Sequence, residues 1–105
     1  MCMSQAQKKV KEILEQHYKI IMEKNCSGVY RRHHCKQYYV SINSRDDFHK
    51  LCNIFKTTYG EPKGKFLTAL IANWVRPDLT LEVVVMTRNP PEAIITIREP
   101  HKNLM

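Results

Sequence analysis

The sequence lacks a long hydrophobic run, an internal repeat, a low-complexity tract and a linker. Its longest apolar stretch, residues 66–75, is interrupted by Thr68 and Asn73 and falls short of the roughly 20 residues that a membrane-spanning helix needs. The first residues lead straight into a charged segment and contain no apolar core of the kind that a secretory signal carries. We therefore expect a protein without a membrane partner that works inside the cell, in the cytoplasm or the nucleus.

The sequence also lacks a catalytic motif. Asp46 and Asp47 are adjacent, so their side chains would diverge on a helix, and a place in the first helical turn accounts for both. Cys35 lies among cations that would favour a reactive thiolate, but no motif of a nucleophilic cysteine surrounds it. We predict that the protein is not an enzyme and requires no cofactor.

No Cys-x-x-Cys pair occurs in the chain. Cys26, His33, His34 and Cys35 offer two thiols and two imidazoles, which are the atoms of a tetrahedral zinc site. Because three of these residues are nearly adjacent, they would converge on one ion only in a tight loop, and we expect no bound metal. Disulfides are rare in the cytosol, so we expect all four cysteines to be reduced.

Composition describes a small basic globular protein. The chain has 105 residues, of which 43% are hydrophobic, and this suits a single domain over residues 1–105 with a loose tail at about 100–105. Seventeen Lys and Arg oppose ten Asp and Glu, which gives a formal charge of +7. Such an excess favours an acidic partner, with nucleic acid as the leading candidate.

Apolar periodicity predicts three helices and three strands. The helices are expected over residues 4–24, 44–59 and 66–75, and the strands over residues 36–42, 79–87 and 93–98. The fold class is therefore α+β, in the order α-β-α-α-β-β, with helices packed on one face of a largely antiparallel three-stranded sheet. The sheet gains a fourth strand if residues 66–75 are extended. The apolar faces of these elements predict a shared core of Leu51, Phe55, Trp74, Val83 and Ile95.

The loop at residues 60–65 reads Gly-Glu-Pro-Lys-Gly-Lys and lies between two predicted helices. The element order over residues 36–98 resembles the KH nucleic-acid-binding module, whose helix pair is joined by a Gly-x-x-Gly loop that clamps the backbone of a single strand. Here the glycines are four apart, Glu61 is acidic and Pro62 is rigid. A simple connector between two helices is the favoured interpretation of this loop.

Residues 30–39 read Tyr-Arg-Arg-His-His-Cys-Lys-Gln-Tyr-Tyr, and no acid occurs between Lys24 and Arg45. Cations beside aromatic rings suit a polyanion with bases, because Arg and Lys neutralise phosphates and Tyr offers a stacking surface. We predict that the protein binds RNA or single-stranded DNA, mainly through phosphates and without strong sequence preference. The predicted contact residues are Tyr30, Arg31, Arg32, Lys36, Tyr39, Lys63 and Lys65.

The alternative prediction is a protein-interaction module that binds an acidic protein or forms a homodimer. Tyr and Arg are also common in the centre of protein interfaces, so the same motif is compatible with both functions. The distribution of charge discriminates between them. A continuous positive face around residues 31–36 would favour nucleic acid, and scattered charge would favour the interaction module.

Overall fold

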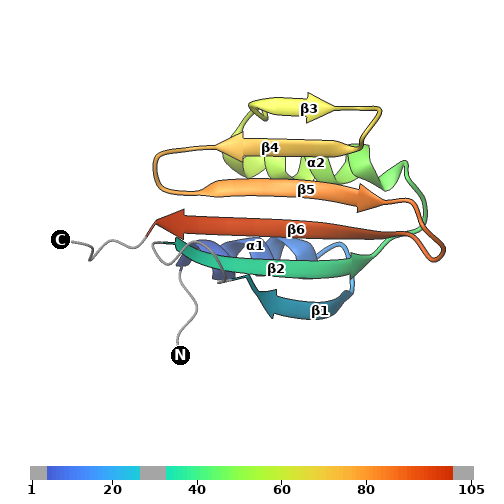
Figure 1. Ribbon diagram of the computed structural model, residues 1–105, viewed down its shortest axis with the longest axis horizontal. Helices are drawn as coiled ribbons and strands as arrows, with labels where there is room; N and C mark the ends of the chain where they lie inside the picture. The colour runs from blue at the N-terminus through green and yellow to red at the C-terminus, as the bar shows by residue number, and fades with distance from the viewer. Residues whose placement is uncertain (1–4, 27–32, 101–105) are drawn as a thin grey trace.

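A computed structural model describes residues 5–26 and 33–100 of the chain. It is a small α+β domain in which one six-stranded antiparallel sheet has the strand order β1-β2-β6-β5-β4-β3, and both helices lie on the same side of it (Figure 1). The elements are α1 (Gln5–Glu15), β1 (Ile20–Asn25), β2 (His33–Ser41), α2 (Asp47–Tyr59), β3 (Gly64–Phe66), β4 (Ile71–Val75), β5 (Thr80–Met86) and β6 (Glu92–Pro100).

The predicted helix over residues 4–24 is wrong in its second half. α1 ends at Glu15, and the chain returns as β1, which pairs antiparallel with β2. Val10 and Leu14 of α1 are buried, as expected for the apolar side of a helix. Ile20, which the prediction placed in the same helix, is instead the first residue of the edge strand β1. β-branched residues favour a pleated strand, and pairing with β2 supplies the backbone hydrogen bonds that a helix would otherwise provide.

The predicted helix over residues 66–75 is also wrong. β3 ends at Phe66, a turn follows, and β4 runs over Ile71–Val75. Leu70, the last residue of this turn, is buried and has a φ of +56°. Its side chain reaches the core from a turn and not from a helix. In β4 the buried residues are Ala72 and Trp74, which is the two-residue period of a strand. The alternative of an extended segment is correct for β4.

The predicted order α-β-α-α-β-β with three or four strands is therefore wrong. The observed order is α-β-β-α-β-β-β-β, with six strands and two helices. The loop at residues 60–65 leads from α2 into β3 and joins no helix pair, so the element order of the KH module is absent. Neither described helix has the length and apolar character needed to cross a membrane.

The helix nearest to prediction is α2. Two local hydrogen bonds mark its start: the Ser44 hydroxyl accepts from the Asp46 amide at 3.2 Å, and an Asp47 carboxylate oxygen accepts from the Asn43 amide at 2.8 Å. Gly60, with φ +82°, follows its last residue. These contacts satisfy backbone groups that a helix end otherwise leaves free.

The core lies between the helices and one face of the sheet. The predicted core of Leu51, Phe55, Trp74, Val83 and Ile95 is confirmed, since all five side chains are buried in one cluster. The rings of Phe55 and Trp74 meet edge to face at 6.0 Å, and the Trp74 indole donates a hydrogen bond of 2.8 Å to the Gly60 carbonyl. This bond ties the end of α2 to β4.

Cys26 and Cys35 form a disulfide across the end of the β1–β2 pair, with a Cα–Cα distance of 5.0 Å. The Cys26 amide also donates to the Cys35 carbonyl at 3.1 Å. The prediction that all cysteines are reduced is wrong for these two, while Cys52 is a free, buried thiol. Because the two sulfur atoms are bonded to each other, neither is a thiolate ligand in this structure.

Candidate functional site

The two faces of the sheet differ in what covers them. α1 and α2 pack on one face, and the other face, turned toward the viewer in Figure 1, carries no helix (Figure 1). We call this second surface the open face. Successive side chains of a strand alternate between the faces, so the residues next to the buried ones along β2, β4, β5 and β6 project onto the open face.

One line of apolar side chains crosses the open face from edge to edge. The strand register places one residue from each of the six strands opposite its neighbour, at right angles to the strands. We call this line the apolar row. In sheet order it consists of Met22, Tyr39, Ile94, Val84, Ile71 and Phe66.

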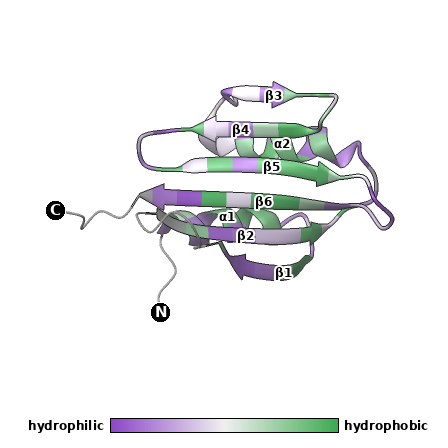
Figure 2. Ribbon diagram, viewed as in Figure 1, coloured by the Kyte–Doolittle hydropathy of each residue, from purple (hydrophilic) through white to green (hydrophobic). Residues whose placement is uncertain are grey.

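The apolar row is accessible to solvent along its length. Phe66 and Met22 at its ends are 58% and 46% exposed, and the four residues between them are partly exposed. The hydrophobic colour in Figure 2 is concentrated in β4, β5 and the middle of β6, whereas β1 is hydrophilic only in its second half, Glu23 to Asn25 (Figure 2). Contiguous exposed apolar surface of this kind is uncommon on a protein that binds nothing.

A polar row lies beside the apolar row, one pleat along the strands. The Gln37 amide donates a hydrogen bond of 3.3 Å to the Thr96 hydroxyl across β2 and β6. Lys24 places its ammonium 5.8 Å from the centre of the Tyr39 ring. The row continues through Glu82 to Asn73, so hydrogen-bonding groups flank the apolar row over most of its length.

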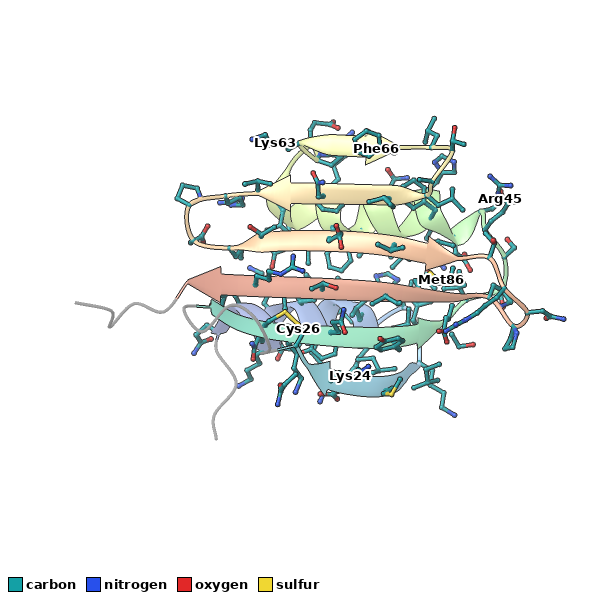
Figure 3. The ribbon with its side chains drawn as sticks, in the orientation of Figure 1. Lys24, Cys26, Arg45, Lys63, Phe66 and Met86 are labelled. Carbon is teal, nitrogen blue, oxygen red and sulfur yellow. A yellow bond between two sulfur atoms is a disulfide. The ribbon has the colours of Figure 1, made fainter. Side chains whose placement is uncertain are left out.

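The charges on the open face are mixed in sign. Among the described side chains, two cations, Lys24 and Arg98, and two carboxylates, Glu82 and Glu92, alternate onto this face. Arg88, in the turn before β6, forms an ion pair with Glu92. Figure 3 shows these strands from the open side, with Lys24 and Cys26 near one edge and Phe66 near the other (Figure 3).

The structure does not gather the predicted nucleic-acid contacts into one patch. Tyr39 lies on the open face. Lys36 lies on the helix-covered face, where its ammonium is 3.5 Å from a Glu23 carboxylate oxygen. Lys63 and Lys65 belong to the β3 edge, four strands away from Tyr39 in the sheet. The other three predicted contacts, Tyr30, Arg31 and Arg32, lie outside the described residues.

Lys36 belongs to a charge cluster that joins three elements. Glu23 of β1 lies between Lys36 of β2 and Lys11 of α1, whose ammonium is 2.9 Å away. The hydrogen bond from Lys11 lowers the pKa of the Glu23 carboxyl, and the same bond raises the pKa of Lys11. This cluster accounts for Lys36 and fixes the position of α1 on the sheet.

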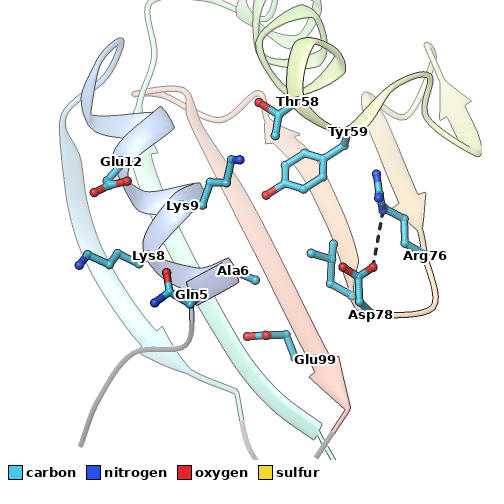
Figure 4. A pocket seen from close by; sticks show the side chains of 11 residues that line it. Gln5, Ala6, Lys8, Lys9, Glu12, Thr58, Tyr59, Arg76, Asp78 and Glu99 are labelled. Atoms are coloured by element: carbon cyan, nitrogen blue, oxygen red, sulfur yellow. Dashed lines mark ion pairs between the residues drawn. The ribbon is translucent and has the colours of Figure 1, made fainter. Parts of the chain in front are cut away.

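A cavity of about 730 Å³ opens on the opposite side, between α1 and the end of α2 (Figure 4). The buried Tyr59 hydroxyl has no hydrogen-bond partner in the described part of the chain, and burial is the largest cause that raises the pKa of this group. The charged lining is mixed. Lys8, Lys9 and Arg76 are matched by Glu12, Asp78 and Glu99, and Arg76 pairs with Asp78 at 3.6 Å. This lining favours no charge class of ligand.

The sequence reasoning missed the apolar row, although a signal for it was present. Strands that face solvent on one side alternate apolar and polar residues, but β5 reads Thr-Leu-Glu-Val-Val-Val-Met and β6 contains Ala-Ile-Ile-Thr-Ile. The consecutive apolar residues 83–86 and 93–95 are typical of strands covered on both faces. The partly exposed positions Val84 and Ile94 come from these two runs.

Within residues 5–26 and 33–100, no group of three or more His, Cys, Asp or Glu side chains is arranged to hold a metal ion. Comparisons of the chain with protein-family models, with curated proteins and with solved structures gave no match. The candidate function therefore rests on the residues of the open face.

Proposed function

We propose that this protein is a non-catalytic interaction domain that binds a protein partner through the open face of its sheet. The observation that carries the proposal is the apolar row, which spans all six strands and which neither described helix covers. Removing apolar side chains from water is favourable by about 25 cal/mol for each Å², and the surplus over the entropy cost of association stabilises the complex. Aromatic residues such as Tyr39 and Phe66 at the centre or end of a contact strengthen it further.

The charge distribution supports a protein partner over a polyanion. Lys36 is held by Glu23 on the helix-covered face, and the described side chains of the open face include carboxylates as well as cations. A surface that binds phosphates needs a local excess of cations, because their release of counterions provides most of the affinity.

Site-specific photo-crosslinking in cells that express the chain tests this proposal. A crosslinking residue at Val84 should capture a discrete protein, and one at Asn53, exposed on α2, should not. Excess wild-type protein should compete with the capture, whereas excess Ile94→Lys protein should not, since a charge in the apolar row blocks the contact. Equal capture from positions 84 and 53 would contradict the proposal.

Nucleic-acid binding remains a second proposal because of one local observation. Tyr39, the predicted stacking residue, is on the open face with Lys24 beside its ring, and Arg31 and Arg32 belong to the connection between β1 and β2. A base stacked on Tyr39 would have a cation within reach of its phosphate.

This second proposal predicts binding of a labelled single-stranded RNA that weakens steeply with salt. Replacing Arg31 and Arg32 together with Glu should reduce affinity for unrelated sequences alike, and Tyr39→Ala should cost about 1–3 kcal/mol for single strands and little for a duplex. Fluorescence anisotropy at low salt measures both. A folded wild-type protein that binds no RNA or DNA under these conditions would eliminate the proposal.

A further inference from the structure

We infer that the partner on the open face is a second copy of this chain, packed sheet against sheet in a two-fold symmetric dimer. This inference rests on the proposed function, which assigns the open face to a protein partner. It goes further because the apolar row, the flanking polar row and the mixed charges are complementary to the same face of another copy.

The position of the apolar row makes the face self-complementary. A two-fold axis between the sheets, parallel to the strands and midway between β5 and β6, places β6 of one copy over β5 of the other. The row runs at right angles to this axis, so it lies over the row of the second copy. Ile94 then faces Val84 of the partner subunit, and Tyr39 faces Ile71 of the partner subunit. Two sheets that pack in this way lie about 10 Å apart with nearly aligned strands.

The same axis also matches the polar row. Gln37 faces Asn73 of the partner subunit, so one amide meets another and each can donate and accept. Thr96 faces Glu82 of the partner subunit, where a hydroxyl meets a carboxylate. No position in these two rows brings two like charges together, and like-charge contacts are what usually prevent a face from pairing with itself.

Net charge also allows this pairing. Two chains of +7 repel each other at long range, and a positive interface would add to that repulsion. The open face instead has carboxylates as well as cations among its described side chains, so the surfaces that meet are mixed in charge and not uniformly positive. An acidic protein partner would meet Glu82 and Glu92 as well as the cations, which makes it the weaker candidate.

The area of the face suits a stable dimer. Six strands at about 4.8 Å spacing give a width of about 24 Å, and strands of three to nine residues extend over about 10–30 Å. The flat footprint is then roughly 500 Å², and protruding side chains give a larger accessible area, close to the about 800 Å² per partner of a standard interface.

Sedimentation equilibrium of the full purified chain, with its disulfide intact, tests the inference. The wild type should have twice the mass of one chain at micromolar concentrations. Val84→Lys places a charge at the centre of the row and should weaken the dimer by about 100-fold or more, and Phe66→Lys should weaken it by about tenfold at the rim. Asn53→Lys adds the same charge on α2 and should leave the dimer unchanged.

Circular dichroism establishes that each variant is folded. Should Val84→Lys fail to fold, Phe66→Lys decides, because its side chain is largely exposed on an edge strand and contributes little to the core. A folded wild type that stays monomeric up to about 1 mM, or a dimer that neither substitution weakens, would overturn the inference. The proposed function has a separate readout: capture of a different protein from position 84, with the purified chain monomeric, would remove the second copy as partner and leave the interaction domain standing.

Discussion

Phe55 and Trp74 are the residues on which the core depends most directly. Both are buried, their rings are in contact, and they join α2 to β4. Phe55→Ala should lower the free energy of unfolding by about 3–5 kcal/mol, because the vacated space is lined by side chains that cannot collapse fully. Trp74 is the single tryptophan of the chain, so its fluorescence reports unfolding in urea.

The matched control for Phe55→Ala is Asn53→Ala, an exposed position on the same helix, whose effect should stay within about 0.5 kcal/mol. Equal urea midpoints for Phe55→Ala and the wild type would show that α2 packs through a different face. The sequence predicted these core residues because their apolar spacing follows the period of each element, whichever neighbours the element meets.

The cysteines are a residue-scale feature that the sequence did not predict. Cys26 and Cys35 meet only because β1 pairs with β2, and β1 lies in a segment predicted as helix. The intracellular location, which motivated the expectation of reduced thiols, stays a prediction. Thiol counts from protein isolated with rapid alkylation test both expectations, since disulfides persist mainly in oxidising compartments.

A thiol titration gives a definite expectation for purified protein. In a Cys2→Ser background, three of the four cysteines remain: Cys26, Cys35 and Cys52. The native protein should show no rapidly reacting thiol, because burial raises the pKa of Cys52 and shields its sulfur. Unfolding without reductant should release one thiol, and unfolding with reductant three. Three reactive thiols without reductant would contradict the disulfide.

At the scale of elements, Glu23 adds an ion pair to the contact that Val10 and Leu14 of α1 make with the sheet. The pKa of this carboxyl is lowered in the folded protein, chiefly by the hydrogen bond from Lys11, so the ionised form stabilises the fold. That stability is present above the ordinary glutamate pKa of about 4.3 and is lost as the pH falls through the lower, folded value. Solvent screens the partly exposed pairs, which limits their contribution to about 1 kcal/mol or less.

Glu23→Gln should therefore reduce the free energy of unfolding at pH 7 by about 0.5–1 kcal/mol, and leave Lys11 and Lys36 facing each other without a carboxylate. The two proteins should become equally stable as the pH drops below the folded pKa of Glu23. Glu12→Gln, which removes a charge from the exposed side of α1, is the control. Urea titrations between pH 3 and 7 measure the difference, and a gap that persists at acid pH would rule out this role of the carboxylate.

Helices and strands whose ends are marked by capping or turn residues in the sequence were predicted well. The edge strands, which form only by pairing with a neighbouring strand, were not. The helix expected over residues 44–59 is α2, and the hairpin expected over residues 79–98 is β5 with β6. Ser44, Asp47 and Gly60 supply the local signals at the ends of α2. β1 and β3 are edge strands whose backbone hydrogen bonds come from the neighbouring strands β2 and β4, and the residue pattern within each edge segment does not contain that information.

At the scale of the whole molecule, the candidate site could not be predicted because it depends on the register of six strands. Met22 and Phe66 are 44 residues apart in sequence (66 − 22), and only the sheet order places them in one line. The predicted site was taken from the sequence motif at residues 30–39. In a strand, alternate residues lie on opposite faces of the sheet, and Lys36 and Tyr39 of β2 are an example. The composition of the chain gives its net charge but does not say on which surface the charged side chains lie.

Hydroxyl-radical footprinting, read by mass spectrometry over a range of protein concentrations, tests most directly whether the open face is the binding surface. Met22 and Phe66, exposed at the two ends of the apolar row, should become protected together as the concentration rises through the dimer transition. Ile54 of α2, on the helix-covered side, should be modified at a constant rate, and the protection should be absent in Val84→Lys. Protection of Ile54 with unchanged modification of Met22 and Phe66 would contradict the account, because the binding surface would then lie on the helices.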